Sequence, residues 1–333
     1  MRIFLTGANG FFGSRLADQL SRDSGHELVL LVRGGRSANA PSGANVRVVT
    51  GDLTEPGSYA AELAGCDAVV HTAAAVSTWA RDKSVFERVN VRGTLDLIEK
   101  ATAGGVGKII YVSSFLALPP SPAGAVLDES VQLERDTHYN DYELTKYRAN
   151  LEVSRLIRDG APVVVLYPTV MYGPGPLTAG NLVVNMVIDH LLGRLPARLG
   201  DGTQTWNFAY VDDVVRGAVR ALEAGRPGDR FILGGENVTL NEFFEIVHRV
   251  TGKAPPRIAL PWPVARMAGA AEELLAWLTG RIPRTTRGVI DIFRLNWAYD
   301  SAHARDELGY APLSLQDGMK RTVAWLRSEG LAT

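Results

Sequence analysis

The sequence predicts an α/β fold in which helices cover both faces of a parallel sheet. In the first half of the chain, short apolar runs such as "RIFLTG", "ELVLLV" and "KIIYVSS" alternate with helix-like segments. Continuous apolar runs are typical of strands buried on both faces, and the alternation is typical of parallel strands joined by crossover helices. A third observation is the glycine-rich turn "TGANGFFG" directly after the first apolar run.

We expect six strands in this half, separated by helices. The expected strands cover residues 2–7, 27–32, 46–52, 67–74, 108–114 and 162–168. The expected helices cover about 12–22, a short stretch after Pro56, 84–103 and 141–158. Right-handed crossovers and a reversal of strand order place a ligand crevice at the carboxyl ends of such strands. The chemistry should therefore lie just after each apolar run.

Beyond Pro168 the alternation gives way to turns rich in glycine and proline, such as "MYGPGPLTAGN". A helix near 182–192, a strand at 230–235 and a helix that starts with the capping-box spacing of Thr239 and Glu242 follow. We therefore predict a sheet domain at 1–170 and a smaller, mostly helical substrate-binding domain at 171–333. A segment near 205–235 should return to the sheet domain.

Composition narrows the class of protein. The net charge is −1 and there is no block of like charges, so the electrostatics favour neither a nucleic-acid partner nor an acidic membrane, and we expect no nucleic-acid partner. The single cysteine, Cys66, precedes an apolar run and is interpreted as a buried small hydrophobe. The six histidines are scattered, and no metal site is expected.

Two segments bear on membranes and on location. The chain opens on a strand without a charged or apolar leader, which predicts a cytoplasmic protein. The segment near 262–280 is hydrophobic but contains Arg266, Glu272 and Glu273, so no membrane span is expected. We interpret it as a helix packed on the protein's own core, with an amphipathic helix on an apolar substrate or membrane surface as the alternative.

The glycine-rich turn predicts a dinucleotide site and hence a Rossmann fold. Gly7, Gly10 and Gly13 lie between a strand and a helix, where a tight turn and close approach to a pyrophosphate both require residues without a Cβ. The helix N-terminus that follows adds unpaired N–H groups and partial positive charge. The loop and helix residues expected beside the cofactor are Asn9, Phe11 and Phe12.

The residue that ends the second strand predicts which dinucleotide is bound. An acid usually stands there and accepts hydrogen bonds from the adenosine ribose 2'-hydroxyl. This chain has Arg33 instead, whose planar set of donors matches a 2'-phosphate, and Arg36 can add a second charge. We therefore predict NADP(H) as the cofactor and keep NAD(H) as the alternative. A solvated arginine without a role is the other interpretation.

The candidates for acid–base chemistry are Tyr142 and Lys146 in "YELTK". Their i, i+4 spacing places them one above the other on a helix, although the spacing alone arises easily by chance. A nearby helix N-terminus and an ammonium group both favour phenolate, so we expect the pKa of Tyr142 to fall below its usual value of about 10. Ser113 and Ser114 end a strand and can hold a substrate oxygen or serve as turn residues; we prefer Ser114.

Together these motifs resemble the extended short-chain dehydrogenase/reductase family, across nearly the whole chain. The matching pieces, in the family's order, are "TGANGFFG", "GDL" at 51–53, "HTAA" at 71–74, "NVRGT" at 90–94, "VSS" at 112–114, "YELTK", "YPTVMYGPG" at 167–175 and "FAYVDDV" at 208–214. The region from Gly228 onwards resembles the dihydroflavonol-4-reductase-like branch, which also holds bacterial members named as hopanoid-associated sugar epimerases.

The resemblance implies a role for each matching residue. Ser114, Tyr142 and Lys146 would form the catalytic triad, and Asn90 would support it through a relay of water and helix backbone. The implied cofactor contacts are Asp52 and Leu53 at the adenine, Thr72, Ala73, Ala74 and Lys146 at the ribose, and Pro168, Thr169 and Val170 at the nicotinamide. Relatives pair through the helices near 84–103 and 141–158, so a homodimer is expected.

The residues after Ser114 favour one reaction within the family. Sugar dehydratases carry an Asp-Glu pair at this place, whereas this chain has Phe115 and Leu116, followed by a proline-rich apolar stretch. This favours reduction of a hydrophobic or aromatic carbonyl compound. The candidate substrate contacts are Val76, Trp79, Phe115, Tyr172 and Asn181. A nucleotide-sugar epimerase that uses bound NAD, a non-catalytic redox sensor and a structural or interaction protein remain as alternatives.

Overall fold

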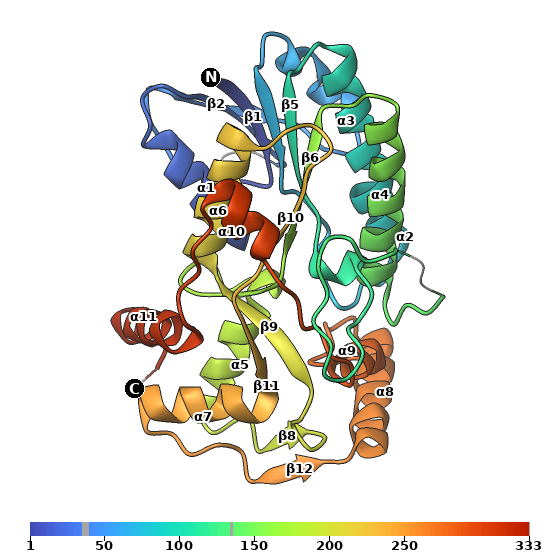
Figure 1. Ribbon diagram of the computed structural model, residues 1–333. Coiled ribbons are helices and arrows are strands. Elements are labelled where there is room, and N and C mark those ends of the chain that lie inside the picture. The colour runs from blue at the N-terminus through green and yellow to red at the C-terminus, as the bar shows by residue number, and fades with distance from the viewer. Residues whose placement is uncertain (35–39, 134–135, 333) are drawn as a thin grey trace.

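The main sheet has seven parallel strands. The computed structural model describes residues 1–34, 40–133 and 136–332. The strands are β1 (Arg2–Thr6), β2 (Glu27–Val32), β3 (Val46–Thr50), β4 (Ala68–His71), β5 (Lys108–Val112), β6 (Val163–Pro168) and β10 (Arg230–Leu233), in the order β10-β6-β5-β4-β1-β2-β3 (Figure 1). All neighbouring strands run parallel, so the predicted fold class is confirmed.

Helices cover both faces of this sheet (Figure 1). One layer contains α1 (Phe11–Ser21), α6 (Val211–Ala224) and α10 (Ala302–Leu308). The other contains α2 (Ser84–Phe86), the π-helical turn η3 (Glu87–Gly93), α3 (Thr94–Ala103) and α4 (Asp141–Arg158). Successive strand residues point to opposite faces, so Phe4 belongs to the core under α3 and α4, while Ile3 and Leu5 belong to the core under α1 and α6.

The strand order places a crevice beside β1. The chain winds from β1 outward through β2 and β3, and then crosses back to β4 on the other side of β1. The loops that follow β1 and β4 therefore leave the sheet towards opposite faces and open a gap at the carboxyl ends of the strands. The glycine-rich turn lies at this edge, because it connects β1 to α1.

The rest of the chain adds two small sheets and further helices. The strands are β7 (Val170–Tyr172), β9 (Thr205–Tyr210) and β11 (Glu236–Thr239) in one sheet, and β8 (Ala197–Leu199) and β12 (Ile258–Leu260) in the other. The helices are α5 (Leu182–Leu191), α7 (Leu240–Thr251), α8 (Trp262–Thr279), α9 (Arg287–Phe293) and α11 (Leu315–Ser328), and the short 3-10 turns are η1 (Pro56–Ser58), η2 (Ala60–Leu63), η4 (Phe115–Ala117) and η5 (Ala179–Asn181). The predicted capping box of Thr239 and Glu242 begins α7.

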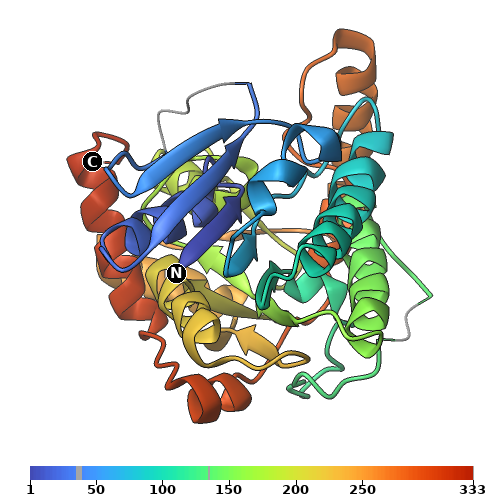
Figure 2. The same cartoon turned by 90° about the horizontal axis from the view of Figure 1, so that it is seen from above.

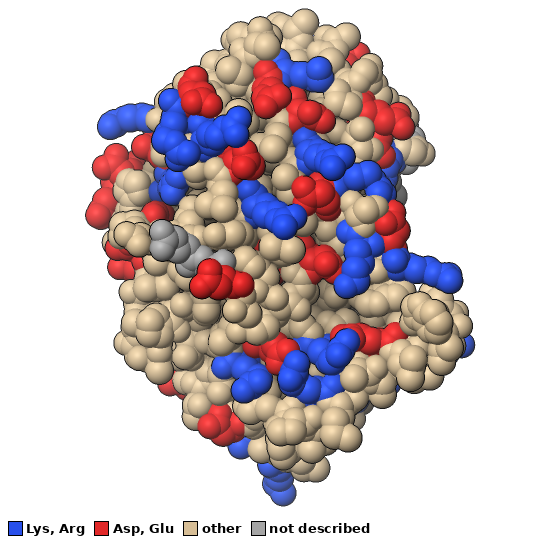
Figure 3. Space-filling view, turned by 90° about the vertical axis from the view of Figure 1, so that its right-hand side faces the viewer, with Lys and Arg blue, Asp and Glu red and all other residues tan. Residues whose placement is uncertain are grey.

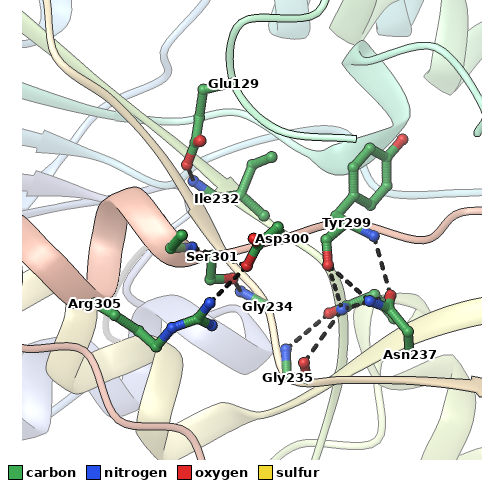
Figure 4. Close-up of polar contacts among 11 residues, drawn as sticks. Glu129, Ile232, Gly234, Gly235, Asn237, Tyr299, Asp300, Ser301 and Arg305 are labelled. Carbon is green, nitrogen blue, oxygen red and sulfur yellow. Dashed lines mark hydrogen bonds and ion pairs between the residues drawn. The ribbon is translucent and has the colours of Figure 1, made fainter. Parts of the chain in front are cut away.

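Residues 205–235 contribute to both regions, because β9 joins the small sheet while α6 and β10 join the main one. The chain passes from the main sheet to the small one between β10 and β11, and polar contacts join this connection to the segment before α10 (Figure 4). The backbone N–H of Ile232 donates to Glu129 at 2.5 Å, and that of Gly234 donates to the Ser301 hydroxyl at 3.0 Å. The Asn237 amide donates to the carbonyl of Tyr299 at 2.9 Å. These hydrogen bonds hold the connection between the two sheets, at residues 232–237, against Glu129 and residues 299–301. A domain boundary at residue 170 stays a proposal.

Helix α8 differs from the expectation that it packs on the protein's own core. Of its residues, only Ala265, Gly269 and Ala276 are buried. The large apolar side chains of this helix are exposed instead, and Figure 2 shows the helix, in orange, standing out from the body of the molecule. Small residues, rather than large ones, face the neighbouring helix α9, which explains how the hydrophobic pattern misled the interpretation. Within the described ranges, no helix is both long and apolar enough to cross a membrane.

Candidate active site

The turn after β1 is shaped for close approach of a ligand to the backbone. Gly7 has a φ of +84°, and a Cβ on Gly7 or Gly13 would collide with the Thr72 side chain. Gly10 caps α1 without any side-chain hydrogen bond, so the first N–H groups of the helix face the turn unpaired by a cap. The buried Oδ1 of Asn9 has no hydrogen-bond partner in the described structure. The glycines and the uncapped helix N-terminus fit a pyrophosphate, which needs N–H donors and a wall without side chains, whereas the Asn9 oxygen needs a donor such as a ribose hydroxyl group.

Phe11 and Phe12 are buried under the same turn and fix the start of α1 on the sheet. Arg15, one turn later, donates from Nε to Asp212 of α6 at 2.6 Å. The glycine turn is therefore carried on a helix that is anchored both by apolar packing and by an ion pair. Such anchoring keeps the N–H groups in place before a ligand arrives.

The carboxyl ends of β1 and β4 are locked together by buried polar side chains. The imidazole of His71 lies between two hydroxyl groups, with Nδ1 2.7 Å from Thr6 Oγ1 and Nε2 2.9 Å from Thr94 Oγ1. Burial, together with the charge of Lys146, lowers the pKa of His71 to about 3, so the ring is neutral. Thr72 donates to the Thr6 carbonyl at 2.7 Å, which positions the candidate ribose contacts Ala73 and Ala74 beside the glycine turn.

Arg33 follows β2 with its side chain exposed, and its charge acts on Asp52, which follows β3. Partial burial would raise the pKa of the Asp52 carboxyl, but hydrogen bonds from Thr54 and the charge of Arg33 outweigh burial and hold this pKa below its usual value. Leu53 is buried against Gly93. Arg33 and Asp52, which are both expected at the adenosine end of the cofactor, thus lie close together. Arg36, the second predicted phosphate contact, lies outside the described residues.

Ser114 and Tyr142 meet although they come from different elements. Ser114 follows β5 and caps η4, where its Oγ accepts a hydrogen bond from Leu116 at 3.2 Å. Tyr142 lies in the first turn of α4, whose N-cap Asn140 accepts from Glu143 at 2.8 Å. The two side chains share a hydrogen bond. The arrangement offers a hydroxyl pair that can hold and protonate one substrate oxygen.

The expected direction of the Tyr142 pKa shift is wrong for this state of the protein. Burial raises the pKa of Tyr142 to about 12, and the hydrogen bond with Ser114 offsets only part of the rise. Burial disfavours the phenolate because the charged form loses its hydration. The sequence indicated the helix N-terminus and the ammonium but gave no measure of this desolvation. Tyr142 therefore keeps its proton near neutral pH.

Lys146 is buried one turn further along α4. Its Nζ donates to the Val112 carbonyl at 3.2 Å and lies 5.5 Å from the centre of the Tyr111 ring. Burial lowers the pKa of Lys146 to about 8. The lysine is thus held at the end of β5, within the same wall as Ser114, and loses its proton at a lower pH than an ordinary lysine while staying mainly an ammonium ion at neutral pH.

Asn90 connects three parts of the site. It lies in the π-helical turn η3, where one extra residue per turn redirects the side chains. Its Oδ1 accepts from the N–H of Ala75 at 2.7 Å, and its Nδ2 donates to Thr145 Oγ1 at 3.1 Å. Asn90 thus joins the loop after β4 to the helix that carries Tyr142. The long helix expected over 84–103 is interrupted here, and sequence periodicity does not reveal such a π turn.

The segment of Pro168, Thr169 and Val170 is held by an asparagine that sequence reasoning missed. Asn207 of β9 is fully buried, and its Oδ1 accepts from Thr169 Oγ1 at 2.7 Å and from the N–H of Gly235 at 2.7 Å. Its Nδ2 donates to the Asn237 side chain at 2.9 Å. An amide in the middle of the apolar strand "TWNFAY" was the available signal, because a buried amide requires partners.

An apolar cavity of about 20 Å³ lies beside Val170. Its lining consists entirely of apolar and aromatic side chains: Val170, Leu182, Val183, Met186, Trp206, Phe208, Leu240 and Phe293. Phe115, which directly follows Ser114, packs edge-on against Trp206 with ring centres 6.3 Å apart. Phe115 thus links Ser114 to the lining of the apolar cavity. Val170, the candidate nicotinamide contact, belongs to the same lining.

A larger cavity of about 430 Å³ has a polar lining. It lies between the loop that contains Trp79, the start of α4 and the helices α8 and α9, on the face that Figure 3 presents. Lys83, Asp141, Arg266, Glu273, Arg287 and Asp291 bring charges of both signs to its wall. The arginines are already paired there, Arg266 with Asp291 and Arg287 with Glu273.

The remaining substrate candidates fall into two groups. Val76 is exposed on the loop after β4, in the same loop as Trp79. Tyr172 and Asn181 are buried and have structural contacts, since the Tyr172 hydroxyl donates to the Leu315 carbonyl at 3.3 Å and the Asn181 amide donates to Gly173 at 3.1 Å. Neither of these two residues lines either cavity. Among the described residues, no group of three or more His, Cys, Asp or Glu side chains is placed to hold a metal ion.

Comparisons with known proteins agree on one family but name several kinds of enzyme within it. Residues 3–234 match the family described as the NAD dependent epimerase/dehydratase family. A Synechocystis sp. protein provisionally named dihydroflavonol 4-reductase is 29% identical over 98% of this chain and 95% of its own length. Sterol demethylase protein B of Methylococcus capsulatus is 28% identical over 99% of this chain and 100% of its own. A dTDP-glucose 4,6-dehydratase from Streptomyces venezuelae, solved with NAD and DAU bound, is 28% identical over 99% and 100% of the two chains, with a TM-score of 0.79.

Proposed function

The chain belongs to the NAD dependent epimerase/dehydratase family, among the extended short-chain dehydrogenases/reductases, and on that premise we propose that it is an NADP(H)-dependent oxidoreductase of a hydrophobic or aromatic carbonyl compound. The observation that carries the proposal is the apolar wall beside Val170, formed by the lining of a cavity of about 20 Å³ and by the Phe115–Trp206 contact. The cavity is too small to hold a substrate, so it would form one wall of the substrate site. A pyranose needs hydrogen-bond partners for its hydroxyl groups, and such a wall offers none.

The chain's own residues suit the cofactor. The glycine turn and the uncapped N-terminus of α1 would hold the pyrophosphate, Arg33 would pair with the 2'-phosphate, and Lys146 would hold the nicotinamide ribose. The cofactor would supply hydride to the carbonyl carbon. Asn9 supports this assignment, because its buried and unpartnered Oδ1 is available to a ligand at the same turn. Asp52 and Leu53 would lie beside the adenine.

The protonated state of Tyr142 is the state that carbonyl reduction requires. Reduction leaves negative charge on the carbonyl oxygen, and a phenol with a pKa raised to about 12 retains the proton that this oxygen needs. Ser114 would orient the oxygen through its hydroxyl group, which already hydrogen-bonds with Tyr142. Asn90 would act as a positioning residue, because its amide holds the loop after β4 against α4.

A nucleotide-sugar epimerase is the second candidate function. The large polar cavity favours it, because the arginines at 266 and 287 could meet a diphosphate. Both arginines are already neutralised by carboxylates, and the apolar wall lies nearer to Val170, so we prefer the reductase. We also propose a homodimer through the helix faces of α3 and α4, on the basis of the family resemblance.

The apolar cavity makes a testable prediction. Met186→Gln adds an amide with which an apolar substrate cannot form a hydrogen bond. The KM for a hydrophobic ketone should therefore rise about tenfold, while the Kd for NADPH should change by less than about twofold. Steady-state kinetics and fluorescence titration measure the two quantities. Leu192→Gln is the matched control, because Leu192 ends the same helix but is exposed. An unchanged KM in Met186→Gln would argue against an apolar substrate beside this wall.

Lys146 predicts a pH dependence of cofactor binding. Below pH about 8 the lysine is mainly an ammonium ion, and above it mainly a neutral amine. Because a bound ribose and phosphate favour the ammonium form, binding should take up protons near pH 8, and the Kd should rise by up to about tenfold per pH unit above it. Calorimetry in buffers of different ionisation enthalpy measures this uptake. Lys146→Met should weaken binding and abolish the uptake; the same uptake in this variant would exclude Lys146 as its source.

A further inference from the structure

Helix α8 carries an apolar face that no other part of the described structure covers. Ala265, Gly269 and Ala276 form its inner side, and Gly269 lets the backbone of Arg287 approach closely. The opposite side has large apolar residues, which we call the α8 face: Val264, Met267, Leu274, Leu275, Trp277 and Leu278, continued by Ile282 in the following turn. Met267 is 72% exposed, Trp277 66%, Leu278 63% and Ile282 77%.

The spacing of these residues makes the face continuous. Met267, Leu274 and Leu278 follow one another at seven and four residues and therefore share one side of the helix. An apolar stripe of this length on a projecting helix is uncommon on a monomer surface and marks a contact with another apolar phase. The helix stands out from the body of the protein, so a flat surface could reach the stripe without obstruction (Figure 2).

The charges around the α8 face are mainly positive. Of the two carboxylates of the helix, Glu273 accepts from Arg287 at 2.7 and 2.8 Å, on the side of α9, and Glu272 accepts from the backbone N–H of Arg284 at 3.2 Å. Glu272 therefore lies beside the turn, where it offsets part of the charge of Arg281 and Arg284. Between residues 274 and 290 the sequence has three arginines and no aspartate or glutamate. Arg281 and Arg284 are exposed beside Ile282. The partner of this face should therefore be apolar within and negatively charged at its surface.

We propose that α8 and the turn at 280–284 dock the protein on an anionic lipid bilayer, with the helix lying in the headgroup region. Leucine and methionine side chains would enter the acyl boundary, Trp277 would occupy the interface, and Arg281 and Arg284 would contact anionic headgroups. A second copy of the chain is a poorer occupant. Pairing two α8 faces would bring the arginines of both copies together, with one glutamate per copy, Glu272, to offset only part of their charge.

Vesicle flotation tests the proposal with the full chain. Vesicles of phosphatidylglycerol mixed with phosphatidylcholine should bind the protein, and vesicles of phosphatidylcholine alone should bind it more weakly. Leu278→Glu should lower partitioning onto the mixed vesicles by at least about tenfold, because it places a charge in the inserted stripe. Replacing Arg281 and Arg284 together by serine should lower it by about tenfold on mixed vesicles and have little effect on the neutral ones.

Val48→Glu is the matched control, since Val48 is also exposed but lies on the edge strand β3 of the main sheet, and it should bind as the unaltered protein does. Circular dichroism checks that each variant is folded. Failure of the unaltered protein to bind mixed vesicles, or equal binding by Leu278→Glu, overturns the proposal. Self-association that Leu278→Glu abolishes, seen by sedimentation without any vesicle binding, would instead assign the face to a second copy. None of these outcomes depends on which reaction the site catalyses.

Discussion

Replacing Tyr142 with phenylalanine should remove turnover and leave cofactor affinity nearly intact. Its hydroxyl is the proton donor at the site and contacts Ser114, whereas the cofactor is expected to be held by the glycine turn, Arg33 and Lys146. Loss of a positioned general acid lowers a rate by about 10²–10⁴-fold. Carbonyl-dependent oxidation of NADPH gives kcat, and fluorescence titration gives the Kd for NADPH.

Tyr147→Phe is the matched control for this experiment. Tyr147 lies on the same helix but packs at a tilt against His138, with ring centres 4.6 Å apart, and takes no part in the contact with Ser114. Its kcat should stay within about twofold of the unaltered protein, since it removes one peripheral hydroxyl. If Tyr142→Phe retained a similar kcat, the proton would have to come from another group and the proposed site would be wrong.

Replacing Arg33 with aspartate should reverse the cofactor preference. The substitution removes a donor pair suited to a 2'-phosphate and introduces a carboxylate that repels it, and the nearby Asp52 adds to this repulsion. The Kd for NADPH should rise by about 10²-fold, while the Kd for NADH should change little or fall, because an acid at this place accepts hydrogen bonds from a 2'-hydroxyl.

Arg226→Asp controls for the change in net charge. Arg226 is exposed in the loop before β10, at the opposite edge of the sheet from the crevice, and its substitution should shift both affinities equally and weakly. Equal losses for NADPH and NADH in Arg33→Asp would mean that Arg33 is only a solvated side chain. The prediction of NADP(H) would then have no support in this chain.

The elements that depend on local pattern could be predicted from the sequence. The parallel strands followed from continuous apolar runs, and α4 begins and ends at Asp141 and Arg158 as expected, since Asn140 caps it. The position of Ser114 at the carboxyl edge of the sheet followed from topology, whereas its meeting with Tyr142 was implied by the family resemblance. The other inferences needed only periodicity, capping and topology.

Properties that depend on burial could not be predicted in the same way. The pKa of Tyr142 rises rather than falls, because desolvation outweighs the local charges that the sequence reveals. Asn207 holds Thr169 only because β9 pairs with β7 in the small sheet, which is a contact between residues distant in sequence. The hydrophobic pattern of α8 predicted burial but does not show which side of the helix packs on the protein. The side that packs proved to be the one with small residues.

The most direct test of the central claim is the stoichiometry of NADPH oxidation over a panel of carbonyl compounds. The purified protein would be incubated with NADPH and, in turn, aromatic aldehydes, hydroxyflavanones, ketosteroids and nucleotide sugars, and absorbance would be compared with alcohol formed. We expect one NADPH oxidised per alcohol formed with an apolar carbonyl compound, and none with a nucleotide sugar. Inversion of a nucleotide sugar by protein that retains NAD, without net consumption of NADPH, would contradict the account.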